Sequence, residues 1–441
     1  MNSRNYFFNN IRLIVITVIL IPLTSIRIYS QTWEIVYDSI HSLGRDVSLT
    51  NDSCYIITST NNPCDPGFCL KINRFGNIIW FSPYGGYEVK QTFDNGYIIG
   101  GSNSSLDGEL KKLDGQGYFL WSESYGGSGQ DEFYSVIQSS DSCYVACGFS
   151  NSHSDSNFYI VKADQEGNLL WEKNFYCYES GYLSEVIEMN NYYYAVGPEY
   201  DSTQSPYLLL IKLNPAGSLI WRKDFQIGNT GLAIAQTSDS SIIVAGGCLL
   251  TKFDLNGDTI WSRSYYPNWI TYSVDITSDN GYILSGKQRY NGWDEVNLLV
   301  KTDSSGNIQW FKTYSNGFTT MINNFESVKS TADSGFITCG YSMYNNNILK
   351  LRILKTNSNG ELINIPEYIK GFDLEVYPNP TSGKIIIENI AFNYIEVFNS
   401  MGNLLFRSMT GKIDISDQPD GIYYVKIVTD KGIAIKKIIK I

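Results

Sequence analysis

Two short stretches of the chain carry the side chains best suited to bind a ligand. Trp269 lies in YYPNWI and Trp293 in QRYNGWDE, and both fall outside a pattern that recurs along the chain. Tyr290, Asp294 and Glu295 stand beside Trp293. Aromatic rings next to carboxylates suit sugar stacking with recognition of hydroxyl groups, or a hot spot for a protein partner. The alternative is that these side chains pack the two loops against one another.

Acidic loop residues offer a route to catalysis. Asp131 with Glu132, or Asp294 with Glu295, could supply the acid and the base that glycoside cleavage requires. The sequence does not give the separation between the carboxyl groups, and acidic loops are common. A secreted carbohydrate-active enzyme, a hydrolase or a lyase, is therefore the alternative to a binding protein.

Histidine and metal chemistry have little support. The two histidines, His41 and His153, lack the neighbours that a catalytic triad or a metal site needs. His153 falls in a loop expected on the same face as the two tryptophans, so we count it among the candidate ligand-binding residues. The segment from Asp254 to Asp258 imitates the start of a calcium loop but lacks the distal Glu. We expect a hairpin turn there, no metal ion and no cofactor.

A repeated pattern must position these residues. In FYIVKADQEGNLLWEKNF its skeleton is Lys162, Asp164, Gly167, Trp171 and Phe175. The same spacing recurs around Trp80, Trp121, Trp221, Trp261 and Trp310. A seventh copy, starting at Lys355, has Asn364 in place of the tryptophan, whereas Trp33 stands near the start of the chain without a copy of its own. Repeats of 40 to 50 residues indicate a propeller or an array.

Each repeat is expected to form four short strands joined by Gly, Asn and Asp turns. Around Trp171 the expected strands are 134–140, 143–148, 158–164 and 168–175. We predict an all-β chain with a seven-bladed β-propeller over residues 31–368, in which the strand carrying Trp33 completes or flanks the last blade. The recurrent tryptophans, and the aromatic residues four positions later, are expected to wedge between adjacent blades.

The pattern resembles the tryptophan-docked repeats of quinoprotein-like propellers, in which an Asp and a Gly turn precede a Trp. The resemblance implies a fold and no cofactor, because the chain has no quinone-binding or calcium constellation. In such a fold the loops between blades, and those between second and third strands, open on one face. The loops with Trp269 and Trp293 are expected on that face, where loop residues most often carry function.

Composition suits an extracellular β-rich protein. The 441 residues include 14% aromatic and 17% charged residues. A net charge of −11 argues against nucleic acid or an anionic membrane as the main partner. Cys64 and Cys69 could close a local disulfide in an oxidising compartment. Four other cysteines are expected to be small core residues: Cys54, Cys143, Cys147 and Cys339.

The N-terminus predicts export. Arg4 and Arg12 precede an apolar run over residues 13–23, which is typical of a signal peptide, here residues 1–30. No later segment is long and apolar enough to span a bilayer, so the mature chain is expected to be fully exported.

A second domain, a small antiparallel β-sandwich, is predicted over residues 372–441 from alternating apolar residues between Pro, Asn and Gly turns. Its motif residues are Tyr377, Pro378, Asn379, Pro380, Gly402, Asn403, Asp420, Gly421, Ile422, Tyr423, Tyr424, Lys436 and Lys437. In their order and position these residues resemble the type A C-terminal sorting domain of the type IX secretion system of Bacteroidota. The resemblance implies recognition by the outer-membrane translocon, then commonly removal of the domain, with release of the protein or its attachment to surface lipopolysaccharide.

Two functions remain open for the propeller. We favour a non-catalytic module, secreted or on the cell surface, that binds a glycan or a protein through loops on one face. The scarcity of histidine and the lack of a recognisable catalytic set argue against the enzyme alternative.

Overall fold

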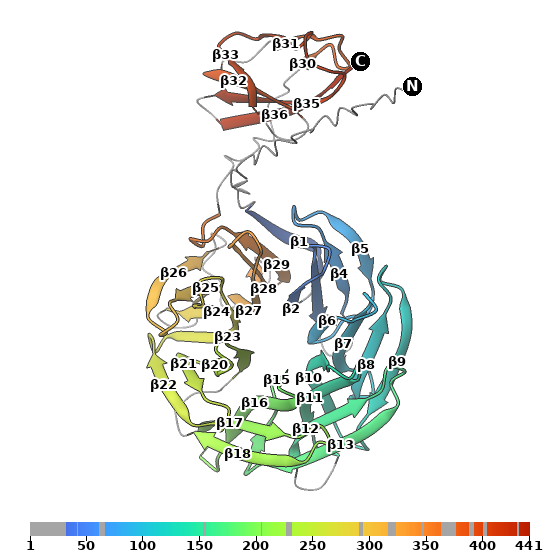
Figure 1. Ribbon diagram of the computed structural model, residues 1–441, viewed down its shortest axis with the longest axis vertical. Helices are drawn as coiled ribbons and strands as arrows, with labels where there is room; N and C mark the ends of the chain where they lie inside the picture. Colours follow the sequence, from blue (N-terminus) through green and yellow to red (C-terminus); the bar gives the residue numbers. More distant parts are fainter. Residues whose placement is uncertain are drawn as a thin grey trace, which may run out of the picture.

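The chain forms a ring of β-sheets and, further along the sequence, a smaller β-domain (Figure 1). The computed structural model describes residues 32–441 except for 42, 61–66, 153–155, 204, 226–231, 291–293, 316–322, 345–347, 363–375, 388–391, 400–403 and 430–431. All of the secondary-structure elements among the described residues are β-strands, which confirms the all-β prediction. The predicted signal peptide lies outside the described residues.

Between Trp33 and Thr356 the described residues form seven antiparallel sheets, which we number in chain order. Sheet 1 contains β2 (Leu43–Leu49), β3 (Tyr55–Thr60), β4 (Cys69–Ile72) and β5 (Ile78–Ser82). Sheet 2 contains β6 (Glu88–Gln91), β7 (Tyr97–Ser102), β8 (Gly108–Leu113) and β9 (Phe119–Tyr125). Sheet 3 contains β10 (Asp131–Gln138), β11 (Tyr144–Ser150), β12 (Ser156–Ala163) and β13 (Leu169–Tyr176).

The remaining four sheets follow the same order. Sheet 4 contains β14 (Ser180–Gly181), β15 (Glu185–Met189), β16 (Tyr192–Tyr200), β17 (Pro206–Leu213) and β18 (Leu219–Phe225). Sheet 5 contains β19 (Ala233–Gln236), β20 (Ile242–Gly246), β21 (Leu249–Phe253) and β22 (Thr259–Ser264). Sheet 6 contains β23 (Trp269–Ile276), β24 (Tyr282–Arg289), β25 (Glu295–Thr302) and β26 (Ile308–Tyr314). Sheet 7 contains β27 (Asn323–Ser330), β28 (Phe336–Tyr344), β29 (Ile348–Thr356) and β1 (Trp33–His41).

The first strand of the chain completes the last sheet. β1 pairs antiparallel with β29, and Trp33 lies opposite Lys355 in this register. The side chain of Trp33 reaches sheet 1, where its indole N–H donates to the Arg74 carbonyl at 2.9 Å. The predicted role of the N-terminal strand is confirmed, since β1 supplies the outer strand that the seventh copy lacks.

The repeated tryptophans join neighbouring sheets. Gly167 has φ +89°, and a Cβ built there would lie 3.0 Å from Cζ3 of the Trp121 ring. The turn therefore needs a residue without a side chain, both for its left-handed backbone and for the ring that rests on it. The same contact recurs around the ring in the pairs Trp33–Gly76, Trp80–Gly117, Trp121–Gly167, Trp171–Gly217, Trp221–Gly257, Trp261–Gly306 and Trp310–Gly360. The predicted wedging between adjacent sheets is thus confirmed.

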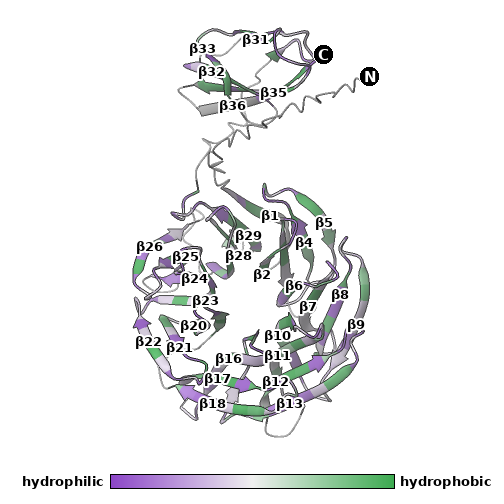
Figure 2. Cartoon of the chain, viewed as in Figure 1, coloured by the Kyte–Doolittle hydropathy of each residue, from purple (hydrophilic) through white to green (hydrophobic). Residues whose placement is uncertain are grey.

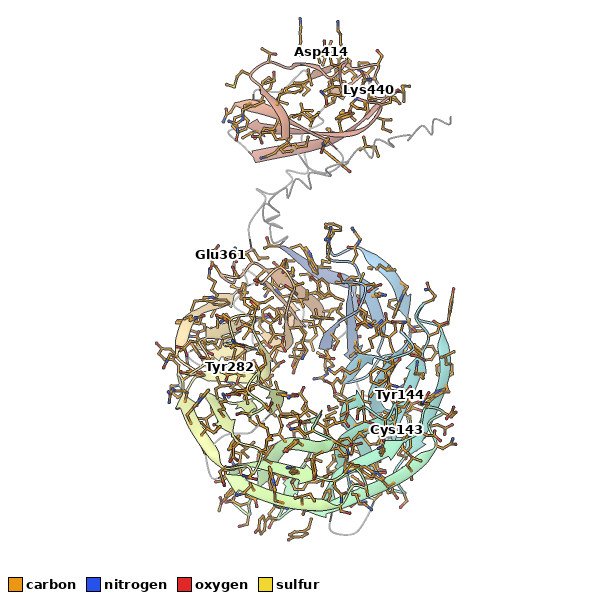
Figure 3. All side chains as sticks on the ribbon, viewed as in Figure 1. Cys143, Tyr144, Tyr282, Glu361, Asp414 and Lys440 are labelled. Carbon is orange, nitrogen blue, oxygen red and sulfur yellow. The ribbon has the colours of Figure 1, made fainter. Side chains whose placement is uncertain are left out.

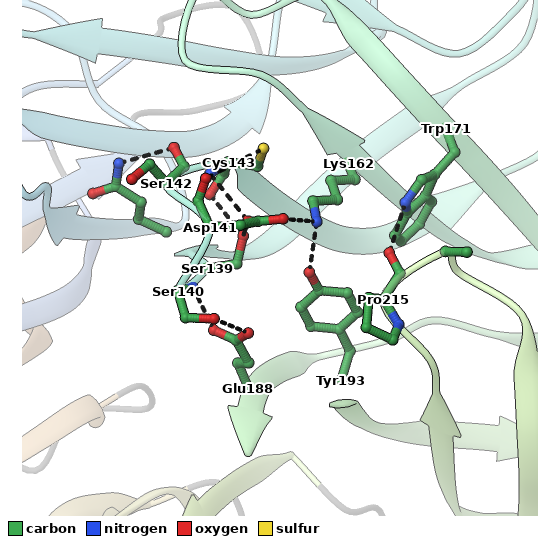
Figure 4. A network of polar contacts seen from close by, with 12 residues as sticks. Ser139, Ser140, Asp141, Ser142, Cys143, Lys162, Trp171, Glu188, Tyr193 and Pro215 are labelled. Atoms are coloured by element: carbon green, nitrogen blue, oxygen red, sulfur yellow. Dashed lines mark hydrogen bonds and ion pairs between the residues drawn. The ribbon is translucent and has the colours of Figure 1, made fainter. Parts of the chain in front are cut away.

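The repeated lysines are internal ion-pair partners. Lys162 donates to Asp141 in the first hairpin of its own sheet and, at 3.0 Å, to the Tyr193 hydroxyl of the next sheet (Figure 4). Six pairs of this kind have N–O distances of 2.5 to 2.9 Å: Lys71–Asp52, Lys112–Asp94, Lys162–Asp141, Lys252–Asp239, Lys301–Asp279 and Lys355–Asp333. Partial burial acts to raise the pKa of Asp141, but hydrogen bonds from Lys162 and Ser139 lower it to about 2.

Sheet 4 departs from this rule because its first hairpin is shorter. Asn190 and Asn191 both have positive φ and form a two-residue turn, with no aspartate at this point. Lys212 instead lies 4.4 Å from the ring centre of Tyr192 and 5.1 Å from that of Tyr194, close enough for cation–π attraction.

Apolar side chains fill the spaces between the sheets, as the side-chain view indicates around Tyr144 and Tyr282 (Figure 3). Cys54, Cys147 and Cys339 are buried, as predicted, whereas Cys143 is only half-buried beside its hairpin turn, so its assignment to the core was wrong. Cys69 is a buried free thiol in β4, so the structure does not bear out the disulfide that the sequence allowed with Cys64, a residue outside the described part. On the outer strands hydrophobic residues also reach the rim of the ring (Figure 2), and Ile79 is 50% exposed.

The C-terminal domain has two sheets that share one core. One consists of β30 (Val376–Tyr377), β31 (Lys384–Ile387) and β34 (Lys412–Asp414); the other of β33 (Leu404–Ser408), β32 (Tyr394–Asn399), β35 (Gly421–Thr429) and β36 (Gly432–Lys440). Ile385 from the first sheet and Val397 from the second are buried in that core. Asn379, from the YPNP segment, accepts the Ile439 N–H at 2.9 Å and so ties the domain's start to its last strand.

Candidate functional site

Trp269 is a core residue. It opens β23, is 2% exposed, and has its ring centre 4.7 Å from that of Tyr266 and 4.9 Å from that of Phe311. No face of its indole is open to a ligand, so the expectation of a Trp269 binding platform is wrong. Loop packing, the alternative for this residue, accounts for its position.

The other residues of the predicted loop site separate into two groups. Tyr290 is 49% exposed, and its backbone N–H donates to the Asp294 carbonyl at 2.8 Å. Glu295 is buried and pairs with both Lys287 and Arg289 at 3.0 Å, so its carboxylate is neutralised within sheet 6. Trp293 and His153 lie outside the described residues.

The proposed catalytic carboxylates of sheet 3 are also occupied. Asp131 is fully buried and accepts the Ser152 hydroxyl at 2.7 Å and the Gly127 N–H at 3.0 Å. Glu132 is half-buried and accepts from Gln130 at 2.7 Å. Asp254 accepts the N–H groups of Asn256 and Asp258, so the calcium-like segment is the hairpin turn expected from the sequence.

A different set of side chains converges at the centre of the ring. In four of the first strands the pairing register shifts, leaving one residue unpaired, and such bulges re-aim the side chain of the extra residue. The bulged residues are Arg45, Tyr134, Tyr272 and Glu326. The first strands surround the middle of the ring in Figure 1, so these residues come from the innermost layer. We call Arg45, Tyr87, Tyr134, Tyr182, Tyr272, Glu326 and Tyr341 the axial cluster; all are half-buried.

Contacts across sheets 1 to 4 hold one side of the axial cluster together. The Tyr134 ring centre lies 4.9 Å from that of Tyr87 and 4.9 Å from that of Tyr182. The Arg45 guanidinium lies 5.1 Å from the Tyr87 ring centre, and the Tyr87 hydroxyl donates to Glu132 at 3.3 Å. Rings from consecutive sheets therefore form one continuous aromatic surface.

Charged groups close the other side of the axial cluster. Arg45 of sheet 1 lies 3.7 Å from the carboxylate of Glu326 in sheet 7, and Asn324 donates to the same carboxylate at 2.7 Å. Burial raises the pKa of Glu326. Burial also raises the pKa of Tyr182 and Tyr341 to about 12, so both hydroxyls keep their protons at neutral pH and can donate hydrogen bonds.

Acidic residues on three of the first strands serve the fold. Asp46, Glu88 and Glu185 each accept a backbone N–H from the neighbouring sheet, at 3.3, 2.7 and 2.8 Å. Burial and the nearby Glu88 raise the pKa of Glu185 to about 7. Each carboxylate accepts a backbone N–H that strand pairing leaves without an acceptor. We therefore assign these carboxylates to holding neighbouring sheets of the ring together.

The axial cluster was not among the sequence-based candidates, although a signal for it exists. In most first strands a variable residue precedes an acidic or serine residue and then valine, as in RDV, YEV, YSV and ESV. The valine belongs to the core, and the variable first position holds the bulged arginine, tyrosine or glutamate. Alignment of the first strands on the valine would have isolated these residues.

Comparison with known proteins identifies the C-terminal part. Residues 375–441 match the family described as the secretion system C-terminal sorting domain. The resemblance drawn from the YPNP segment onward is confirmed, and this domain marks the protein for export to the cell surface or outside the cell. The chain is thus an exported protein with a β-propeller fold. No curated protein matches the chain.

Solved structures similar to the chain are remote in sequence. The WD40 domain of Pan2 from Neurospora crassa is 13% identical, with 74% of this chain and 96% of that chain covered and a TM-score of 0.49. Virginiamycin B lyase from Staphylococcus aureus is 9% identical, with 74% and 98% covered and a TM-score of 0.47. A protein of unknown function from Bacteroides caccae is 13% identical, with 59% and 93% covered and a TM-score of 0.42. Within the described residues, no helix has the length and apolar character needed to cross a membrane.

Proposed function

We propose that the protein is an exported, non-catalytic binding module that holds a glycan at the axial cluster. The observation that supports this proposal most directly is the continuous row of Tyr87, Tyr134 and Tyr182, with successive ring centres 4.9 Å apart. Aromatic faces offer apolar area to a sugar ring, while phenol hydroxyls and a few charged groups orient it. The Arg45–Glu326 pair supplies such groups at the same place.

The loop that carries Tyr290, Trp293 and Asp294 belongs to the same proposal as an outer contact. Tyr290 and Asp294 are exposed, which leaves them available to a ligand that extends from the axis. A protein ligand is the competing outcome, because tyrosine and arginine are also enriched in protein hot spots. The sorting domain implies a further partner, the type IX translocon, during export.

A glycan array probed with wild type and two variants tests the proposal. Tyr134→Ala removes the central ring of the row, and a hot-spot residue of this kind contributes about 2 kcal/mol, or roughly 30-fold in affinity. Tyr118→Ala is the control. Tyr118 is 72% exposed in the hairpin turn between β8 and β9, whereas the axial cluster comes from the first strands of the sheets. Equal binding by wild type and Tyr134→Ala would exclude the axial cluster, and binding to proteins but to no glycan would exclude the ligand class.

One observation favours catalysis as a second candidate. Glu326 lies beside Tyr341 within the axial cluster, and its pKa is raised. A carboxyl that holds its proton more firmly can act as a general acid. In that case Glu326→Gln would abolish polysaccharide turnover, a much larger loss than the change in affinity that follows from altering the Arg45–Glu326 pair. Product release by wild type, measured as reducing ends or unsaturated products, would establish the enzyme.

A further inference from the structure

A pocket of about 330 Å³ opens where sheets 7 and 1 meet, at the junction that β1 closes. Its walls come from three hairpin turns: the turn between β27 and β28, the turn between β2 and β3, and the turn between β4 and β5. The volume lies at the lower end of the range for small-molecule sites. We call it the closure pocket.

Leu49 makes this junction different from its neighbours. At the same position, the last residue of the first strand, sheets 2 and 3 have Gln91 and Gln138. Each glutamine accepts a backbone N–H from the first turn of the preceding sheet, Asn51 at 2.8 Å and Phe93 at 2.7 Å. A leucine accepts no hydrogen bond, so this polar link is missing between sheets 7 and 1, and the Leu49 side chain is 44% exposed.

The apolar wall of the closure pocket departs from the repeat at two more positions. Phe75 precedes the turn glycine of sheet 1, where the other sheets have Gln116, Glu166, Ala216, Asn256, Ser305 and Asn359. Ala332 is the smallest residue at its position in the first turn, where others have Asn51, Phe93, Ser140, Ser238 and Ser278. Phe75 is 45% exposed. Core packing therefore does not account for Phe75 and Leu49, which leave an apolar surface open.

Arg74 is the single cation on the wall of the closure pocket. Its guanidinium carbon lies 4.8 Å from the ring centre of Phe75, and it forms no ion pair with any of the described residues. An arginine that rests its flat face on an aromatic ring keeps the N–H groups at its edge available. Their planar arrangement matches the two oxygens of a carboxylate.

The acidic groups around the closure pocket are already neutralised. Asp333, the one carboxylate on its wall, pairs with Lys355 at 2.9 Å. Asp52, in the turn between β2 and β3, pairs with Lys71 at 2.7 Å. The charge left over at the pocket is therefore the positive charge of Arg74.

We propose that the closure pocket binds a small amphiphilic carboxylate, with its apolar body between Leu49 and Phe75 and its acidic group on the Arg74 guanidinium. This site is separate from the axial cluster, because no residue of that cluster lines the pocket. A neutral ligand of the same shape would keep the apolar contacts but lose the charge-assisted hydrogen bonds. A cationic ligand would be repelled by Arg74.

Titration calorimetry with octanoate and 4-phenylbutyrate tests the proposal, with octanamide and octylamine as the neutral and cationic comparisons. We expect a carboxylate to bind more tightly than octanamide, and octylamine to bind least. Arg74→Gln should lower the affinity for the carboxylate about tenfold and leave that for octanamide unchanged. Leu49→Gln restores the residue type of sheets 2 and 3, so it should keep the wild-type melting temperature while the affinity for both ligands falls.

Arg263→Gln is the matched control. Arg263 also stacks on an aromatic ring, with its guanidinium carbon 5.4 Å from the ring centre of Trp261, but it lies in sheet 5, which does not border the closure pocket. It should bind the carboxylates as wild type does. Failure of wild type to bind either carboxylate, or equal carboxylate affinity in wild type and Arg74→Gln, would overturn the proposal. Neither result would bear on glycan binding at the axial cluster.

Discussion

Substitution of Trp33 by alanine tests whether the first strand closes the ring. The half-buried Trp33 ring lies 6.3 Å from that of Tyr55, rests on Gly76, and donates to the Arg74 carbonyl at 2.9 Å. Removal of a fully buried tryptophan costs about 3–5 kcal/mol, and we take about half of that for a half-buried ring. The lost hydrogen bond adds about 1 kcal/mol, so we expect a total near 3 kcal/mol.

Thermal unfolding measures this loss. For a domain of this size, 3 kcal/mol corresponds to a fall in Tm of about 5 °C. Limited proteolysis should also cut within β1 earlier in Trp33→Ala than in wild type, because its sheet-1 contact is lost. Ile79→Ala, at a half-exposed position on the outer strand β5, is the control and should change neither measurement. An unchanged Tm with unchanged protease resistance would refute closure through Trp33.

Two further predictions concern the repeat. The pKa values of Asp52, Asp94, Asp141 and Asp279 are lowered from 3.8 to about 2, so their ion pairs stabilise the fold fully above pH 3.8 and lose that contribution as the pH falls toward 2. Denaturant midpoints between pH 6 and 2 should fall over this window, less steeply in Asp141→Asn, and a flat profile would contradict the ion-pair assignment. Gly167→Ala should destabilise the ring by about 1–2 kcal/mol or more, because alanine is strained at φ +89° and its Cβ would meet the Trp121 ring. Gln165→Ala in the same turn should be neutral in the same denaturation assay, and equal effects would remove the special role of the glycine.

The frame of the protein was predictable because its signals are local and repeated. The spacing of Gly167 and Trp171 recurs in sheet after sheet, and each sheet uses it in the same way. Trp33 indicated that the first strand closes the ring. It belongs to no copy of the repeat, and the seventh copy lacks its tryptophan, so each supplies what the other is missing. The sorting domain was identifiable for the same reason, because its motif residues lie in order within one short segment.

The contents of the candidate site were less accessible from the sequence. Trp269 stood out because it lies outside the repeat, yet it packs on Tyr266 and Phe311 and is buried. Glu295 looked like a free acid but pairs with two cations that lie six and eight residues before it in sequence. In this protein, a residue that departs from the repeat was therefore as much a sign of unusual packing as of contact with a ligand.

Sequence alone determined the all-β character, the repeat, the strand that completes the last sheet and the route of export, because each depends on residues a few positions apart or on strict recurrence. Tertiary structure decided which side chains meet at the axis. Arg45 and Glu326 lie at opposite ends of the ring-forming chain and come within 3.7 Å only because the ring closes. The bulges that turn them inward arise from a one-residue shift in the pairing of the first strand with the second, which depends on both strands and becomes visible only when they are paired.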